Sequence, residues 1–115
     1  MRIITGTARG VNLVTLEGEE ITRPTTQRTK EGIFSAIQFE LTNRRVLELF
    51  SGCGQMALEA LSRGAQSAVM IDESAEAVEI IKTNAKKTGL IKSCRISRMD
   101  TASILNRQTV EKNLT

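Results

Sequence analysis

Two glycines in the middle of the chain have the spacing of a ligand-binding turn. Gly52 and Gly54 directly follow the apolar run 46–50, and they begin the pattern Gly-x-Gly-x-x-Ala ahead of a helix-like segment over residues 56–63. Glycine lets the backbone turn tightly and approach a ligand with no Cβ in the way. A strand, a glycine turn and a helix N-terminus together bring N–H groups up to a nucleotide-like ligand. We therefore expect an adenosine-containing cofactor here, with a turn that binds nothing as the alternative.

Carboxylates follow two later predicted strands. Asp72 comes directly after residues 67–71 and 20 residues after Gly52, where such folds place a carboxylate that accepts from ribose hydroxyls. Glu73, the next residue, is the alternative candidate for binding the ribose hydroxyls. Asp100 follows the third predicted strand at the same edge of the sheet. It is expected to accept from an adenine amine, to cap a short helix after it, or to do both.

Glu48 is an acidic residue inside an otherwise apolar predicted strand. A buried carboxylate needs a cation or several hydrogen-bond donors. Two explanations stay open at this point. Glu48 meets the ammonium of S-adenosylmethionine directly or through water, or it pairs with Arg45 or another basic residue of the fold. A nicotinamide site would have no such requirement at this position.

Alternating strands and helices are predicted to bring these residues to one edge. The core strands are expected over 46–50, 67–71 and 93–97, and the helices over 56–63, from Ser74 to about Gly89, and for a turn or two at 102–106. Ser74 is a good N-cap and Gly89 a good helix stop. This alternation predicts an α/β fold with a parallel sheet, which binds ligands at the carboxyl ends of its strands.

The first residues of the chain are predicted to form a hairpin. Residues 2–4 and 11–14 have strand-like composition, and Gly6 and Gly10 punctuate the segment between them.

A helix is predicted after this hairpin. It begins at Pro24, the only proline, with Thr25 or Thr26 as a cap, and it runs to about Phe39. Its apolar stripe has helical spacing and consists of Ile33, Phe34, Ile37 and Leu41.

Charge is distributed unevenly along a chain whose formal net charge is +3. Residues 1–45 carry a net charge of +2 (7 basic, 5 acidic), residues 46–81 carry −5 (1 and 6), and residues 82–115 carry +6 (8 and 2). The two basic flanks could steer a polyanion such as RNA or DNA to the molecule. Solvated helix faces are the alternative, and charge does not decide between the two.

Composition excludes several functional classes. The chain has no His, so a Cys/His metal site and a His-based triad are excluded. Cys53 and Cys94 are too few for a disulfide framework or a zinc site, and Cys53 is explained as a small turn residue. No apolar run has the length of a membrane span and no signal-peptide pattern is present. We expect a cytoplasmic protein with no membrane partner and no metal.

Three segments of the chain carry a family resemblance. They are MRIITG (1–6) with ARG (8–10), TRPTT (22–26) followed by Arg28, Lys30, Glu31 and Phe34, and LELFSGCG (47–54) with LEALSRGA (58–65). In this order, and over nearly the whole chain, they resemble the small bacterial 16S ribosomal RNA guanine-N2 methyltransferases, which use S-adenosylmethionine. The Arg-Pro-Thr helix start is more specific than the glycine turn.

The resemblance implies a fold, a cofactor, a partner and two sets of residues. The fold is α/β: a truncated class I methyltransferase (Rossmann-like) parallel sheet, with an N-terminal β-hairpin extension over 1–22 and a partial S-adenosylmethionine-binding domain over 23–115. The partner is ribosomal RNA or the assembling small ribosomal subunit. The implied cofactor residues are Glu48, Gly52, Gly54, Asp72 and Asp100. The implied RNA-binding residues are Arg2, Arg9, Arg23 and Arg28.

One motif of the family is absent from these 115 residues. The family grips its target amine with Asn/Asp-Pro-Pro-Tyr/Phe after a fourth core strand, whereas Pro24 is the only proline here. We therefore expect the chain to be the front portion of a longer protein, to contain no catalytic residue and to methylate no RNA alone. Two alternatives remain: a nicotinamide-dependent oxidoreductase fragment, and a non-catalytic RNA-binding remnant of a methyltransferase.

Overall fold

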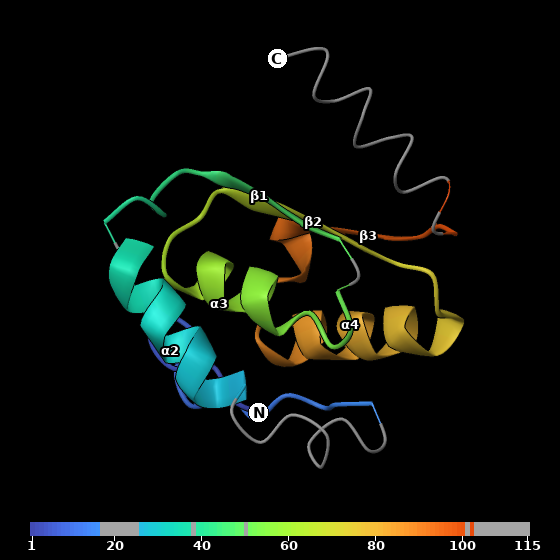
Figure 1. The fold of residues 1–115 in the computed structure, drawn as a ribbon, viewed down its shortest axis with the longest axis horizontal. Helices are drawn as coiled ribbons and strands as arrows, with labels where there is room; N and C mark the ends of the chain where they lie inside the picture. The colour runs from blue at the N-terminus through green and yellow to red at the C-terminus, as the bar shows by residue number, and fades with distance from the viewer. Residues whose placement is uncertain (17–25, 38, 50, 101, 103–115) are drawn as a thin grey trace.

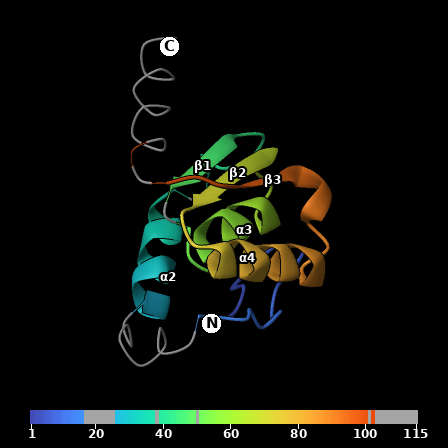
Figure 2. The ribbon, with the colours of Figure 1, turned by 90° about the vertical axis from the view of Figure 1, so that its right-hand side faces the viewer.

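A three-stranded parallel sheet forms the centre of the molecule. The computed structural model describes residues 1–16, 26–37, 39–49, 51–100 and 102. The sheet has the order β1-β2-β3, with β1 (Arg45–Leu49), β2 (Ser67–Asp72) and β3 (Cys94–Arg98). Three helices lie on one side of it: α2 (Thr26–Ile37), α3 (Gln55–Ser62) and α4 (Ala75–Lys87) (Figures 1 and 2). The predicted α/β class with a parallel sheet is confirmed.

The core elements begin and end close to their predicted positions. The Ser74 hydroxyl caps α4 by accepting the Ala77 N–H at 3.2 Å, and Gly89 follows the helix with a φ of 74°. The third strand starts at Cys94 because residues 91–93 form a short 3-10 helix, η1 (Ile91–Ser93). Residues 17–25, 38, 50, 101 and 103–115 lie outside the described part, and with them the predicted start of the α2 helix and most of the predicted helix at 102–106.

The main core lies between the sheet and the helices. Alternate residues of each strand face the helices, as the two-residue period of a strand requires. The core gathers Ala57, Leu58 and Leu61 of α3, Ala68 and Met70 of β2, and Ile81 and Ala85 of α4. A second cluster joins Phe34 of α2 to Leu41 and Ala60. Ile33, which was predicted to share the apolar stripe of α2, is instead 43% exposed.

The N-terminal segment lies on the side of the helices away from the sheet (Figure 1). The two predicted strands are reduced to one antiparallel bridge, Arg2↔Asn12, with the Ile3 N–H donating to the Val11 carbonyl at 3.0 Å. The pairing stays short, and the N–H groups of Ile4, Thr5 and Val14 donate to side chains of α3 and α4 instead of to carbonyls of the opposite segment. The side chains Ile3, Ala8 and Leu13 are buried in the main core.

Gly6 marks the closest approach of this segment to α3. Its φ is 93°, and a Cβ at this position would overlap the Ser62 carbonyl. The next N–H, that of Thr7, donates to the same carbonyl at 2.9 Å. Glycine is therefore required here both by backbone angle and by space.

Candidate cofactor site

The glycine turn lies at the carboxyl end of β1 and is held by β2. The Gly52 N–H donates to Asp72 Oδ2 at 2.9 Å, and the Ser51 N–H donates to the Ile71 carbonyl at 3.0 Å. Asp72 Oδ1 accepts the Ser74 N–H at 2.9 Å. One carboxylate thus fixes the turn and the start of α4 at the same time.

Both glycines of the turn have backbone angles that favour glycine, and Gly54 is also closely packed. Gly52 has a φ of 63° and Gly54 a φ of 81°, in the left-handed region that favours glycine. A Cβ on Gly54 would lie 3.2 Å from the Met70 sulfur and 3.3 Å from Ile81 Cγ2. The space beside Gly54 therefore belongs to the core, whereas the sequence suggested that it would be left for a ligand.

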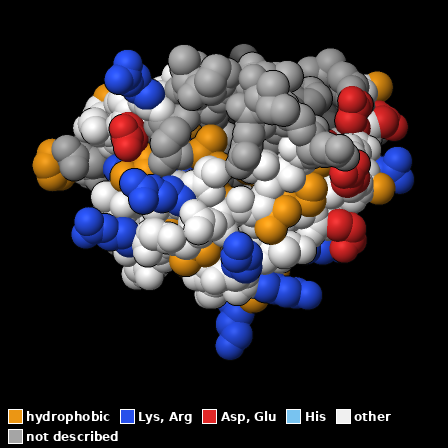
Figure 3. Space-filling model, turned by 90° about the horizontal axis from the view of Figure 1, so that it is seen from below, with side chains coloured by type: hydrophobic (Ala, Val, Ile, Leu, Met, Phe, Trp, Pro, Cys, Tyr) orange, Lys and Arg blue, Asp and Glu red, His pale blue; other side chains and the backbone are white. Residues whose placement is uncertain are grey.

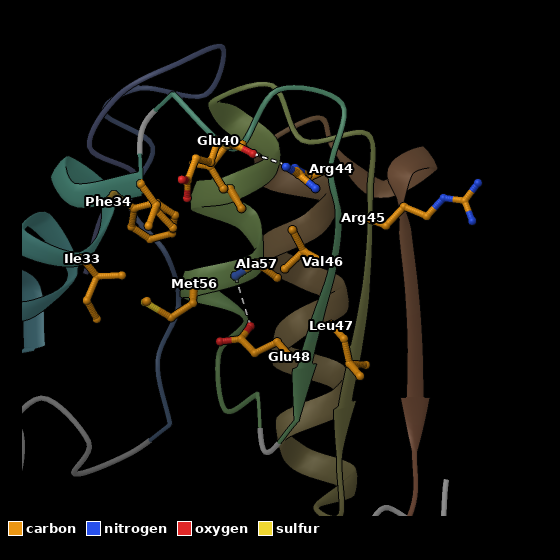
Figure 4. Close-up of a pocket in the computed structure, with 13 residues that line it drawn as sticks. Ile33, Phe34, Glu40, Arg44, Arg45, Val46, Leu47, Glu48, Met56 and Ala57 are labelled. Atoms are coloured by element: carbon orange, nitrogen blue, oxygen red, sulfur yellow. Dashed lines mark hydrogen bonds between the residues drawn. The ribbon is translucent and has the colours of Figure 1, made fainter. Parts of the chain in front are cut away.

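Glu48 points from β1 toward the first turn of α3. Its Oε1 accepts the Ser51 hydroxyl at 2.7 Å. The same oxygen accepts the Ala57 N–H at 3.2 Å (Figure 4). Burial raises the pKa of this carboxyl above its ordinary value, and the hydroxyl donor, the N–H donors and the more distant charge of Lys30 offset only part of that rise. Arg45, the partner considered from the sequence, is exposed and points away (Figure 4). Among the described residues, no cation contacts Glu48.

An apolar groove opens beside Glu48 between α2, β1 and α3 (Figure 4). It has a volume of about 420 Å³. Its apolar walls include Ile33, Phe34, Ile37, Leu41, Val46 and Met56. Exposed Ile33 is explained by its place on this open wall.

Two further polar features lie at the same edge of the sheet. The buried Oε1 of Gln55, the first residue of α3, has no hydrogen-bond partner within the described part of the chain. Leaving such an atom unpaired costs about 1–3 kcal/mol, which a donor on a ligand would recover. Past the ends of β2 and β3, a cavity of about 600 Å³ is lined by Glu73, Arg98, Met99 and Asp100. Asp100 therefore faces open space near Asp72, whose carbonyl accepts the Met99 N–H at 3.1 Å.

Sequence reasoning missed a buried charge cluster around Glu59. This carboxylate is fully buried in α3 and accepts the N–H groups of Ile4 at 2.8 Å and Thr5 at 3.2 Å. Lys30 Nζ lies 3.1 Å from Oε1, and Arg63 Nε lies 2.9 Å from Oε2. Although burial alone raises its pKa, the N–H donors, Arg63 and the Lys30 charge together hold the pKa of Glu59 below its ordinary value. The cluster ties α2, α3 and the N-terminal segment together.

Asn84 of α4 is a second buried polar residue that was missed. Its side chain bonds both Val14 in the N-terminal segment and Cys53 in the glycine turn. For both Lys30 and Asn84, the position in the sequence indicated a buried polar side chain. Lys30 lies four residues before Phe34 on the apolar stripe of α2, and Asn84 lies between Ile81 and Ala85 on that of α4. A polar residue on an apolar stripe is buried and must be paired.

The basic residues predicted to meet RNA are spread over the N-terminal side of the molecule. Arg2, Arg9 and Arg28 are exposed, and Arg23 lies outside the described residues. Arg2 is brought close to α2 because its carbonyl accepts Lys30 Nζ at 3.0 Å. Seen from this side, most Lys and Arg side chains lie in the left and lower parts of the surface, and most acidic side chains gather at the right (Figure 3).

Two kinds of feature are absent from the part of the chain that the structure describes. No group of three or more Cys, Asp or Glu there could hold a metal ion. None of its helices has the length and apolar character needed to cross a membrane.

The family model described as Conserved hypothetical protein 95 matches residues 1–114. The chain belongs to this family. Its similarity to curated relatives confirms the resemblance to 16S ribosomal RNA methyltransferases. YlbH of Bacillus subtilis, whose name assigns it provisionally as an rRNA methyltransferase, is 37% identical over 106 residues, which cover 92% of this chain and 57% of that protein. Ribosomal RNA small subunit methyltransferase D of Escherichia coli is 32% identical over 116 residues, which cover 99% of this chain and 57% of that protein.

A solved structure shows the same fold at similar identity. A hypothetical protein of Thermus thermophilus superposes with a TM-score of 0.81 and 31% identity, over 97% of this chain and 63% of that one. The chain therefore spans somewhat more than half the length of the curated relatives it matches.

Proposed function

We propose that this chain is the cofactor-binding part of an S-adenosylmethionine-dependent methyltransferase that acts on small-subunit ribosomal RNA. The observation that carries the proposal is the arrangement at the carboxyl edge of the sheet. There, Asp72 holds the glycine turn in place beside a second carboxylate, Glu48, which no cation of the described residues contacts. Relatives named as rRNA methyltransferases support the reaction class.

The acceptors at this edge fit S-adenosylmethionine. Glu48 and the unpaired Gln55 Oε1 would accept from the ammonium of its amino-acid end. Asp72 already accepts two N–H groups, but each carboxylate oxygen has two acceptor sites, so ribose hydroxyls can still bind. Asp100 would accept from the adenine amine. NAD offers no ammonium and would bring no cation into contact with Glu48.

The chemistry that the cofactor supplies is an activated sulfonium methyl group, so catalysis depends mainly on position. The residues of this chain would hold the cofactor and exclude water from its methionine end. The target that we propose, the exocyclic N2 of a guanine, must leave its base stack to reach the edge of the sheet. No described residue is assigned to the target amine, and we propose that the 115 residues alone do not methylate RNA.

The RNA would be met by the N-terminal side of the molecule. Arg2, Arg9 and Arg28 are exposed there, and Arg23 precedes α2 in the sequence. Exposed arginines bind phosphates and give affinity that falls with salt. We propose that these four residues contact the RNA backbone.

Calorimetry with this chain tests the cofactor proposal. Titration with S-adenosylhomocysteine should give saturable binding, and titration with NAD should give none. Binding of NAD with no response to S-adenosylhomocysteine would refute the methyltransferase proposal and favour the nicotinamide alternative.

A non-catalytic RNA-binding role is a second candidate, because residues 1–115, which span 57% of the length of the curated relatives, contain a single proline and thus no Asn/Asp-Pro-Pro-Tyr/Phe motif. Incubation of small ribosomal subunits that lack the modification with labelled S-adenosylmethionine separates the two candidates when this chain is compared with any longer product of the same gene. Both candidates predict no label from the chain alone, and only the methyltransferase proposal predicts label from the longer product. Transfer by the chain alone would show that its activity has another source than the family motif.

A further inference from the structure

We propose that Asn84 is a positioning residue that couples the N-terminal segment to the glycine turn, so that RNA binding and cofactor binding strengthen each other. The inference rests on the proposed function, because it takes the N-terminal segment as the RNA-facing part and the turn as the cofactor-facing part. It adds a link between them that passes through one side chain.

The link consists of three hydrogen bonds from a fully buried amide. Asn84 Oδ1 accepts the Val14 N–H at 2.7 Å, and Nδ2 donates to the Val14 carbonyl at 2.8 Å. The same Nδ2 donates to the Cys53 carbonyl at 2.9 Å. Cys53 lies between the two glycines of the turn. The N–H of Gly52, the residue before it, donates to the Asp72 carboxylate. An unbroken series of contacts therefore joins Val14 to Asp72.

The chemistry of this position requires an amide. Asn84 lies on the buried stripe of α4 with Ala77, Ile81 and Ala85, where an apolar side chain would fill the same space. Burial of an asparagine is tolerated there only because all of its polar atoms are bonded. Aspartate would keep the bond to the Val14 N–H but would lose both donors and bring an unpaired charge into the core.

The coupling follows from what each ligand orders. RNA bound to the N-terminal segment would hold Val14 in place, and Val14 would hold the Asn84 amide in the orientation that bonds Cys53. A turn that is already ordered needs less free energy to receive the cofactor. Thermodynamic linkage requires the cofactor to strengthen RNA binding by the same factor.

Ser62 offers a matched control. Its hydroxyl also fastens the N-terminal segment, by donating to the Thr5 carbonyl at 2.7 Å and accepting the Ala8 N–H at 2.9 Å. No bond from this side chain to the glycine turn is found among the described residues. Ser62→Ala therefore loosens the segment without breaking its link to the turn, whereas Asn84→Ala breaks the link.

The test measures the dissociation constant of S-adenosylhomocysteine with and without a saturating 16S ribosomal RNA transcript. The wild-type chain should bind the cofactor product at least about fivefold more tightly with RNA, which is the lower end of common coupling. Asn84→Ala should reduce this factor to within twofold of one, and Ser62→Ala should retain it. Wild-type binding of both ligands without coupling, or full coupling in Asn84→Ala, would overturn the inference and leave the proposed function standing.

Amide hydrogen exchange of the wild-type chain gives a second test. It uses no variant, so misfolding of a variant cannot affect the result. Adding the RNA transcript alone should slow exchange at Val14 and at Gly52 and Gly54 together. Slowing confined to the N-terminal segment would refute the link. Failure to bind either ligand would refute the proposed function as well.

Discussion

The Gly52 N–H donates to the Asp72 carboxylate at 2.9 Å, although the two residues belong to different strand–helix units. The bond makes the proposed ribose acceptor a structural support of the turn that faces the same ligand. A change at Asp72 therefore acts on the ligand and on the turn at once.

Asp72→Ala should weaken binding of S-adenosylmethionine by about 1–3 kcal/mol, because charge-assisted hydrogen bonds to the ribose are lost. It should also lower the melting temperature, since the Gly52 and Ser74 N–H groups lose their acceptor. Calorimetry and thermal unfolding measure the two effects. Asp72→Asn, which keeps one acceptor oxygen, should give a smaller loss of both. Unchanged affinity in the alanine variant would show that the ribose site lies elsewhere.

Glu48→Gln should make the ligand-free chain more stable at pH 7 and should weaken cofactor binding at least about tenfold. The folded-state pKa of Glu48 is raised above 4.5, so the ionised carboxylate opposes folding at neutral pH. At a pH below the unfolded-state pKa, Glu48 is protonated in both the folded and the unfolded wild-type chain. The extra stability of the glutamine variant over the wild type should then vanish.

Urea unfolding of the wild type and of Glu48→Gln at pH 7 and pH 4 measures this difference. Ser51→Ala removes a donor to the same carboxylate and should shift stability in the opposite direction at pH 7. A glutamine variant that is less stable than the wild type at pH 7 would contradict the argument.

Glu59→Gln should lower the free energy of unfolding by about 3–5 kcal/mol, because the buried Lys30 is left without its anion. The pH dependence has the opposite sign to that of Glu48. The folded-state pKa of Glu59 is depressed below 4.5, so its contribution is present above the unfolded-state pKa and is lost as pH falls toward the folded one.

Denaturation curves between pH 3 and 7 test the Glu59 prediction, with Glu79→Gln as the control. Glu79 is exposed and its pair with Lys82 is long, at 3.7 Å, so this variant should stay within about 0.5 kcal/mol of the wild type. Equal small losses in both variants would mean that the buried cluster adds nothing to stability.

Arg9→Ala should weaken binding of a 16S ribosomal RNA transcript and reduce the salt slope of binding by about one, with cofactor affinity unchanged. Arg9 is exposed in the turn of the N-terminal segment. Arg95 is also exposed, but it lies on β3. Its neighbours Cys94 and Ile96 pack against the core, so Arg95 lies on the other face of the sheet, away from the helices and the N-terminal segment. Arg95→Ala should leave RNA binding intact. Equal losses of RNA affinity in the two variants, measured by filter binding, would mean that RNA binds through overall charge and not through a defined face.

The strands, helices and turns of the core could be predicted from the sequence because they depend on short-range residue patterns. The glycine turn, the Ser74 cap and the apolar stripes of the helices each depend on residues a few positions apart. The places of Glu48 and Asp72 at the ends of strands followed from the same patterns.

The rest depends on pairs that no local pattern encodes. The hairpin predicted at the N-terminus forms only as one bridge. The N–H groups of Ile4, Thr5 and Val14 donate to the side chains of Glu59 and Asn84, which no local pattern indicates. The polar positions of Lys30 and Asn84 on apolar stripes indicated that a partner was needed. The identity of that partner required the three-dimensional structure.

The anchoring of the N-terminal segment sets an order of events during synthesis of the chain. The side-chain bonds that hold residues 4–14 span 54 to 70 positions, ending at Asn84. At ordinary rates of translation, residues 4–14 leave the ribosome on the order of ten seconds ahead of Asn84, their last partner. Throughout that time Ile3, Ala8 and Leu13 have no core to enter. The segment that completes the folded core is thus made well before its partners, and the nascent chain exposes it to chaperones and proteases until they follow.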